Sequence, residues 1–369
     1  MYTEENLFSI ALRECSNIGD INFHKLVHTF GSAENVWKAS SKELQKITGI
    51  GRKTISDIGD KKYLKFAEQE IIFCENNNIQ INLRHLGQLP FLLKECEDTP
   101  AILYQKGNIN PDLHPVSIVG TRKITSYGKS FIETFFEESK KHKFISVSGL
   151  ALGTDKEVHT ESIRQNIPTI AVLAHGFHTL YPSGNKNLSE KILSENGALF
   201  TEFNSSRKPD RENFIQRNRI IAGISDSTII VETAFGGGSI STATFANNYN
   251  RDVFALPGKI TDKFSQGCNH LIFQNKAIAI STIQDLINQI GFNSPKEKIE
   301  ELFPHAETVT QLTDSQQSIY KIIITHPQIS LDDLAEKTAQ PTHKILTTVL
   351  ELELLGKVKS LSGRQFVSI

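Results

Sequence analysis

The sequence predicts an α/β fold built on a doubly wound, mostly parallel sheet, with a smaller, mainly helical domain on each side of it. Short apolar runs alternate with helical segments through the middle of the chain, as in successive βαβ units. Several of these runs are followed by loops rich in glycine, serine and threonine. Open α/β sheets bind ligands at such loops, beyond the carboxyl ends of the strands.

Length and composition fit two or three globular domains. The chain has 369 residues, of which 38% are hydrophobic and 22% charged, and its formal net charge is −1. A general electrostatic attraction to nucleic acid is therefore excluded, and any DNA binding has to come from a local basic patch.

The four cysteines do not form a recognisable set. They are scattered, with neither a CxxC pair nor matching histidine spacing, so we expect no disulfide framework, no metal site and no cofactor. The N-terminus lacks a basic segment followed by an apolar one, and no run approaches the roughly 18 apolar residues of a membrane span. We expect a cytoplasmic protein without membrane contact.

Residues 1–80 are predicted to form a helical domain. Within it, the segment from Leu44 to Ile55 resembles a helix-hairpin-helix. Gly49 and Gly51 flank one apolar residue in a tight turn, and Arg52 and Lys53 begin the next helix, whose free amides suit a phosphate. These four residues are a candidate secondary DNA contact, although a compact turn between packed helices would give the same pattern.

An earlier, looser copy of this hairpin surrounds Gly19 and Asp20. Because Asp20 would repel a phosphate, we expect that copy to be structural.

Residues 82–292 are predicted to form the central sheet domain. The expected strands are Val116–Val119, Phe144–Val147, Thr169–Leu173, Ala198–Phe203, Thr228–Val231 and Val253–Leu256. The expected helices between them include Lys129–Lys141, Asp155–Gln165, Leu188–Glu195 and Phe214–Ile224.

Three loops of this domain are candidates for binding phosphate, because small residues let the backbone approach an anion at a helix N-terminus. Together they would form a rim longer than one mononucleotide needs. Neither GxGxxG with a following acidic residue nor GxxxxGK[ST] occurs, which argues against a dinucleotide cofactor and against P-loop hydrolysis. The candidate residues are Gly120, Thr121 and Arg122 in the first loop, Ser148 and Gly149 in the second, and Gly237, Gly238 and Ser239 in the third.

A basic segment follows between residues 207 and 223. Guanidinium groups suit phosphates, so Arg217, Asn218 and Arg219 are candidate DNA contacts. The two arginines are two positions apart and would face different sides of a helix. The alternative is that one of them pairs with a carboxylate such as Glu202 or Asp226.

Three residues of the central domain suggest an enzyme, but we expect structural roles for them. Asp155 would interact with a helix dipole and His159, one turn later, would contact it. Neither a nucleophile nor a metal set accompanies them or Glu232.

The C-terminal region is predicted to be a linker at 293–312 followed by a domain at 313–369. A helix at Leu331–Thr338, a longer one from Thr342 to Leu355 and two strands, Lys357–Leu361 and Gln365–Ser368, resemble a winged helix. Its second helix carries Glu351 and Glu353, a poor cationic footprint, so we expect a protein-interaction or weak duplex-binding role.

In its central region the chain resembles the DNA-processing protein A family, also called DprA or Smf. The resemblance rests on an ordered set of motifs that spans the whole central domain, and the flanking domains fit as well. The motifs are Ser117–Arg122, Tyr127-Gly128, Ser148–Asp155, His159, Tyr181–Asn185, Gly197 with Glu202, Phe214 with Arg217–Gly223, Val231-Glu232, Thr242-Ala243, Arg251–Gly258 and Gly267–Ile272.

The resemblance implies an extended Rossmann-like central domain without an established reaction. It further implies a homodimer that binds and protects single-stranded DNA and helps to load the recombinase RecA during natural transformation. By the same resemblance Gly120, Thr121 and Arg122 would bind phosphate, and Lys186 would be a second cation.

One position departs from the family pattern. Where the family often has a lysine before the third loop, this chain has Gly236 or Phe235, which should weaken DNA binding there. Phe235 could stack on a base instead, or pack against protein.

Two other functions stay open at this point. A nucleotide phosphoribohydrolase with a related core would need an acidic residue in the third loop, and residues 236–245 contain none. A scaffold that binds only a partner protein would show no salt-sensitive DNA affinity.

Overall fold

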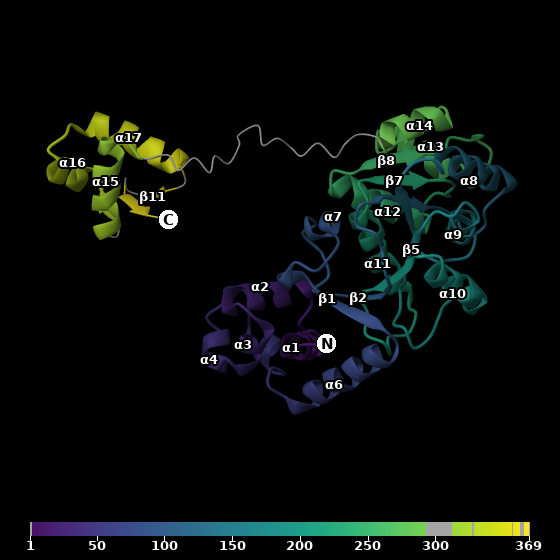
Figure 1. The fold of residues 1–369 in the computed structure, drawn as a ribbon, viewed down its shortest axis with the longest axis horizontal. Coiled ribbons are helices and arrows are strands. Elements are labelled where there is room, and N and C mark those ends of the chain that lie inside the picture. The colour runs from purple at the N-terminus through teal and green to yellow at the C-terminus, as the bar shows by residue number, and fades with distance from the viewer. Residues whose placement is uncertain (1, 293–311, 327, 356, 362–364, 369) are drawn as a thin grey trace. The chain divides into compact units, whose positions relative to one another are not determined.

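The computed structural model describes residues 2–292, 312–326, 328–355, 357–361 and 365–368. The chain forms two compact units, Met1–Asn293 and Ser294–Ile369 (Figure 1). The first unit contains both the predicted N-terminal and the predicted central regions. The predicted linker at 293–312 lies outside the described residues except for Leu312.

The N-terminal helices pack around a core that includes Leu12, Phe23 and Leu26 and that also contains Ile81 and Ile102 of the sheet. Thr3, Ser32, Ser40 and Asp60 cap helix starts by accepting hydrogen bonds from backbone amides. The helices are α1 (Glu4–Glu14), α2 (Asp20–Phe30), α3 (Ala33–Lys38), α4 (Ser41–Leu44), α5 (Arg52–Ile55) and α6 (Lys61–Asn76).

A nine-stranded sheet forms the centre of the first unit, in the order β1-β2-β6-β5-β4-β3-β7-β8-β9. Neighbouring strands from β6 to β9 pair in parallel, whereas β1 and β2 are antiparallel, which confirms the predicted mostly parallel sheet. The strands are β1 (Ile79–Leu83), β2 (Ile102–Gly107), β3 (His114–Val119), β4 (Phe144–Ser148), β5 (Thr169–Val172), β6 (Ala198–Thr201), β7 (Ser227–Ile230), β8 (Asp252–Ala255) and β9 (Ile278–Ala279).

The strand order reverses between β3 and β7. From β3 the chain continues through β4, β5 and β6 on one side, and then returns to β7, β8 and β9 on the other. Crevices beyond the carboxyl ends of strands at such a reversal are the usual ligand sites of doubly wound sheets.

Helices cover both faces of the sheet. One face packs its apolar side chains against α11 and α12, and the other against α8, α9 and α14, so the parallel strands inside the sheet are buried on both sides, whereas the edge strand β9 is exposed. The helices are α7 (Phe91–Lys94), α8 (Ser126–Ser139), α9 (Thr154–Arg164), α10 (Lys186–Ser194), α11 (Arg211–Ile224), α12 (Gly238–Asn248), α13 (Gln266–Phe273) and α14 (Ile283–Ile290).

The second unit is a winged helix, as predicted. Three helices pack on a small antiparallel sheet of order β10-β12-β11, around a core that includes Leu334, Ile345 and Phe366. Its elements are α15 (Asp314–Thr325), β10 (Ile329–Ser330), α16 (Leu331–Thr338), α17 (Thr342–Leu354), β11 (Val358–Leu361) and β12 (Gln365–Ser368). In the described parts of the chain, every helix is too short or too polar to cross a lipid bilayer.

Candidate nucleic-acid interface

The loops after β3, β4 and β7 interlock at the carboxyl edge of the sheet. The Thr154 amide donates to the Thr121 carbonyl over 3.0 Å, which joins the second loop to the first. Gly153 has φ +77°, and a Cβ there would lie 2.4 Å from the carbonyl carbon of Arg122. A Cβ on Gly120 would lie 2.9 Å from the Glu232 carbonyl oxygen at the start of the third loop. The three candidate loops therefore form one packed edge, which we call the rim (residues 120–123, 149–154 and 232–239).

Arg122 is an exposed cation of this rim. Its guanidinium carbon lies 5.0 Å from the ring centroid of Phe214, a half-buried aromatic residue near the start of α11. The Tyr181 ring packs edge-on against Phe214 at 5.8 Å and is 46% exposed. Stacking on the ring holds the guanidinium in place while its hydrogen-bond donors remain available to a ligand.

The sequence signals for this aromatic pair are weak. Phe214 precedes Arg217 by one helical turn in the basic segment, and Tyr181 begins a motif in which only the following lysine was predicted to bind DNA. Neither residue was predicted as a site residue.

Arg217 lies beneath the rim rather than on it. Only 4% of the residue is exposed, and its guanidinium donates to the carbonyl oxygens of Gly149, over 2.7 Å, and of Val172. A Cβ on Gly149 would lie 2.5 Å from this guanidinium, so Gly149 makes room for Arg217. Burial lowers the pKa of Arg217 to about 10, against the opposing effect of Asp155, so the group stays charged at neutral pH. The structure therefore places this predicted DNA contact under the backbone of the second loop.

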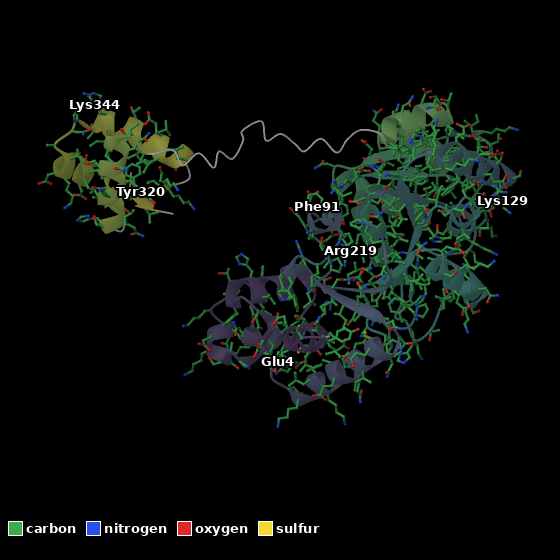
Figure 2. All side chains as sticks on the ribbon, viewed as in Figure 1. Glu4, Phe91, Lys129, Arg219, Tyr320 and Lys344 are labelled. Atoms are coloured by element: carbon green, nitrogen blue, oxygen red, sulfur yellow. The ribbon has the colours of Figure 1, made fainter. Side chains whose placement is uncertain are left out.

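Arg219 lies between the N-terminal helices and the sheet (Figure 2). It donates to Glu202 Oε2 over 2.5 Å, to Asp20 Oδ2 over 3.3 Å, and to the Asp98 carbonyl oxygen. The alternative in which one arginine pairs with Glu202 is thus the one found for Arg219. Asp20 also accepts from the Ala101 amide over 3.0 Å, which supports the structural role expected for the first hairpin copy.

Asn218, between the two arginines, reaches the third loop. Its amide nitrogen donates to the Gly238 carbonyl over 3.2 Å and to Ser241 Oγ over 2.9 Å. Helix α12 begins after Gly237 without a side-chain cap. The hydroxyl of Ser239 is buried and has no hydrogen-bond partner among the described residues. Asn218 thereby fixes a helix N-terminus that still has free donors for an anion.

Other predicted residues have mixed surroundings. Ser148 is buried and donates to the Ile118 carbonyl over 2.7 Å, so its hydroxyl is already bonded. Phe235 is 62% exposed, with its ring 5.2 Å from that of His270. Lys186 is exposed at the start of α10, where it lines a cavity of about 440 Å³.

The four predicted residues of the N-terminal hairpin lie together, at the turn between α4 and α5. This turn belongs to the helical part of the first unit and not to the rim. Helices α4 and α5 each have only four residues, and Gly49, with φ +82°, allows the turn between them. Arg52 and Lys53 are exposed at the start of α5, beside Gly51.

The residues that suggested an enzyme have structural partners. His159 shares a hydrogen bond of 2.8 Å with Thr169 Oγ1, and burial lowers its pKa to about 3. Glu232 is buried and accepts from the Thr125 amide over 2.9 Å and from its hydroxyl over 2.5 Å, at the start of α8. Asp155 is buried as well and accepts from the Ala151 amide over 3.3 Å, within the second loop.

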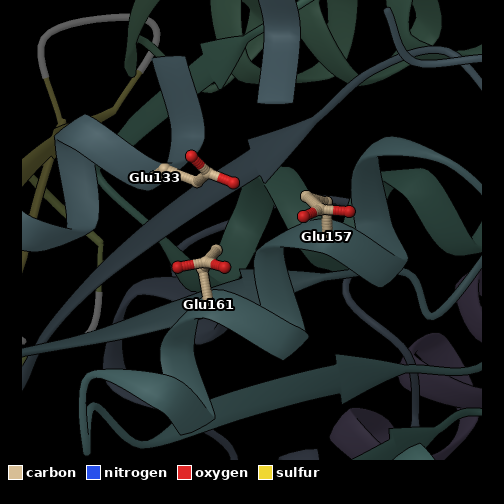
Figure 3. A group of neighbouring side chains, drawn as sticks. All are labelled: Glu133, Glu157 and Glu161. Atoms are coloured by element: carbon tan, nitrogen blue, oxygen red, sulfur yellow. The ribbon is translucent and has the colours of Figure 1, made fainter. Parts of the chain in front are cut away.

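Three glutamates on α8 and α9, Glu133, Glu157 and Glu161, bring carboxylate oxygens within 4.8 Å of one another (Figure 3). Arg164 lies 2.7 Å from Glu161 and Lys129 lies 3.9 Å from Glu157, so nearby cations already offset much of this charge. We assign no metal to this cluster, because Glu161 is already paired with Arg164 and exposed acidic groups such as Glu133 are common without an ion.

Comparison with known proteins gives consistent results over the whole chain. Residues 81–291 match the family model described as DNA recombination-mediator protein A, and residues 303–364 match the DprA winged helix domain. Protein Smf of Synechocystis is 30% identical over 401 residues, which cover 99% of each chain. DNA processing protein DprA of Bacillus subtilis is 37% identical over 205 residues, 55% of this chain and 68% of its own.

Two solved structures share the fold. The X-ray structure of DprA from Streptococcus pneumoniae matches with a TM-score of 0.62 and 27% identity, over 78% of this chain and 98% of that one. The DprA of Helicobacter pylori, whose single-stranded DNA binding mode has been studied structurally, matches with a TM-score of 0.52 and 27% identity, over 57% and 95%.

Proposed function

The chain belongs to the DNA recombination-mediator protein A family, and from this membership we propose that it binds single-stranded DNA along the rim, without catalysing a reaction. The observation that carries the proposal is the position of Arg122, exposed at the reversal of strand order and stacked on Phe214. A guanidinium there suits a phosphate, and its hydrogen bonds carry no sequence information.

The aromatic pair beside Arg122 supports single-stranded rather than duplex DNA as the ligand. Tyr181 is 46% exposed beside the half-buried Phe214, so its ring can receive an unpaired base. Base stacking tolerates any sequence because every base has a flat π face. Bases of a duplex are already stacked on their neighbours and offer no such face.

We divide the predicted site residues into two groups. Gly120, Thr121, Arg122, Gly237, Gly238 and Ser239 form the surface that meets the phosphates, with Lys186 as a further cation. Ser148, Gly149, Arg217 and Asn218 hold that surface in place, because their polar groups already bond to protein. Arg219 lies apart from both groups and joins the N-terminal helices to the sheet. The family lysine before the third loop is absent from this chain, where Gly236 or Phe235 stands. Phe235 is therefore the remaining candidate contact at the third loop.

The flanking parts have supporting roles in this proposal. The hairpin with Gly49, Gly51, Arg52 and Lys53 is a secondary DNA contact. The winged helix serves protein contacts, because α17 exposes Leu346 and Leu350 one turn apart on its surface.

We propose that the protein acts as a homodimer in the cytoplasm and helps to load RecA onto the strand it protects during natural transformation. The surface around α13 and β9 is our candidate for the contact between copies. Phe273 is 83% exposed and Ile278 lies on the edge strand, which leaves an apolar surface beside unpaired strand groups.

The experiment is fluorescence anisotropy with a labelled single-stranded oligonucleotide across a salt series, with a duplex of the same length as competitor. We expect log K to fall with log salt at about −0.7 per phosphate neutralised, and the duplex to compete weakly. No binding at low salt would contradict the proposal and favour a scaffold that binds only protein.

A further inference from the structure

A cavity of about 440 Å³ lies between α10 and the loop that follows β5. Its floor is apolar, with Phe177, Leu180 and Leu193 packed against the buried Leu199 of β6. Lys106 of β2 and Lys186 of α10 are both among its lining residues. The cavity is within the size range that holds small organic ligands in proteins.

This cavity continues the rim, because one loop of the chain serves both. Residues 177–180 line the cavity, and the next residue, Tyr181, packs against Phe214 beside Arg122. The chain therefore connects the cavity directly to the aromatic pair of the rim.

Two buried side chains fix the loop in this position. Asn185, just before α10, donates to the Leu150 carbonyl of the rim over 2.9 Å. The Tyr181 amide donates to Nε2 of the buried His175 over 3.1 Å. The cavity is therefore formed before any ligand arrives, which reduces the cost of ordering on binding.

The charges around the cavity suit an anionic ligand with an apolar part. The lining contains two cations, Lys106 and Lys186, and one carboxylate, that of Glu190. His178 is the remaining titratable group in the lining. A nucleotide unit of a single strand has this combination, with a flat base that can leave water and a phosphate that stays at the surface.

We propose that the cavity takes up one base of the bound single strand, while Lys186 binds the phosphate beside it. This inference rests on the proposed function, since it needs a strand that follows the rim. It also gives the protein a means of rejecting duplex DNA, because a paired base would first have to leave its stack, at a cost in free energy.

The test uses the full chain with Thr179→Met, which narrows the cavity mouth from an exposed position. The matched control is Thr160→Met, an exposed threonine on α9. The probes are a labelled oligothymidylate and an oligomer of the same length whose sugars carry no bases. We expect Thr179→Met to weaken oligothymidylate binding about tenfold and to leave the abasic oligomer and the salt slope unchanged.

A second measurement identifies the residues that a base touches. An oligonucleotide with one 4-thiothymidine is photo-crosslinked to the wild type, and the modified residue is located by mass spectrometry. Crosslinks to Phe177, Leu180 or Leu193 would support the cavity.

Equal binding by Thr179→Met and wild type, or crosslinks confined to Phe214 and the third loop, would overturn the inference alone. Failure of the wild type to bind either oligomer would overturn the proposed function, and the inference with it.

Discussion

Replacing Arg219 with methionine should destabilise the first unit by leaving a buried carboxylate without its cation. Arg219 and Glu202 have side chains only 7% and 2% exposed, and their charged atoms lie 2.5 Å apart. Removal of one partner of a buried ion pair typically costs about 3–5 kcal/mol, since the remaining charge stays out of water. In a unit of this size, this corresponds to a fall in melting temperature of about 10 °C.

The pH dependence of this deficit gives a second signature. Burial raises the pKa of Glu202, whereas Arg219 lowers it, so the substitution should raise the pKa of the folded state further. A carboxyl group with a raised folded-state pKa contributes stability below its unfolded-state pKa and loses it as the pH rises. The deficit of Arg219→Met should therefore shrink as the pH falls from 7 towards 5.

Fluorescence of Trp37 is a suitable assay, because it is the only tryptophan of the chain and lies in the N-terminal core. The matched control is Lys140→Met, whose cation is 53% exposed and whose partner Glu137 is 67% exposed, so its loss should cost no more than about 1 kcal/mol. Equal melting temperatures for the two variants, or a deficit that grows as the pH falls, would refute the reasoning.

Three further predictions concern the rim and the core beneath it. Gly153→Ala should lower both stability and DNA affinity in melting and anisotropy experiments, because φ is +77° and the new Cβ would meet the Arg122 backbone at 2.4 Å. Its control, Gly31→Ala, has φ +83° and open space around it, so it should lower stability by backbone strain alone and keep the wild-type DNA affinity; the same DNA affinity in both variants would contradict the packing argument. His159→Gln should make the loss of stability with falling pH less steep in urea titrations. Burial lowers the histidine pKa to about 3, so the wild type should lose about 2 kcal/mol from this group by pH 5, and equal pH slopes in variant and wild type would contradict this. Phe214→Leu should weaken oligonucleotide binding about fivefold in anisotropy and make the salt slope shallower, because the ring that holds the Arg122 guanidinium in place is lost; an unchanged slope would contradict this role.

The parallel core of the fold was predictable because its strands are buried on both faces and read as continuous apolar runs. All six predicted strands are present in the sheet. The strands β1, β2 and β9 were not predicted, since β9 has two residues and the other two pair antiparallel before the first recognised run. Helix α8 begins at Ser126, three residues before the predicted start, because Thr125 caps it.

The site was predictable as a set of loops but not as a division of roles. Glycine and arginine in the sequence suggest phosphate contact, yet the same residue types also allow close packing and buried ion pairs. Which of the two occurs at Arg217 and Arg219 depends on carbonyl groups and carboxylates far away in the sequence, such as Val172 and Asp20. The stack of Arg122 on Phe214 is likewise a tertiary contact that joins distant segments.

The salt dependence of oligonucleotide binding by Arg122→Ala tests the central claim most directly. Arg164→Ala, which removes an exposed cation from α9, is the matched control. The account predicts that Arg122→Ala weakens binding and makes the salt slope shallower by about 0.7 for each phosphate that the arginine neutralises in the wild type, while the control keeps the wild-type slope. Identical affinity and slope in Arg122→Ala and wild type would show that the strand does not follow the rim.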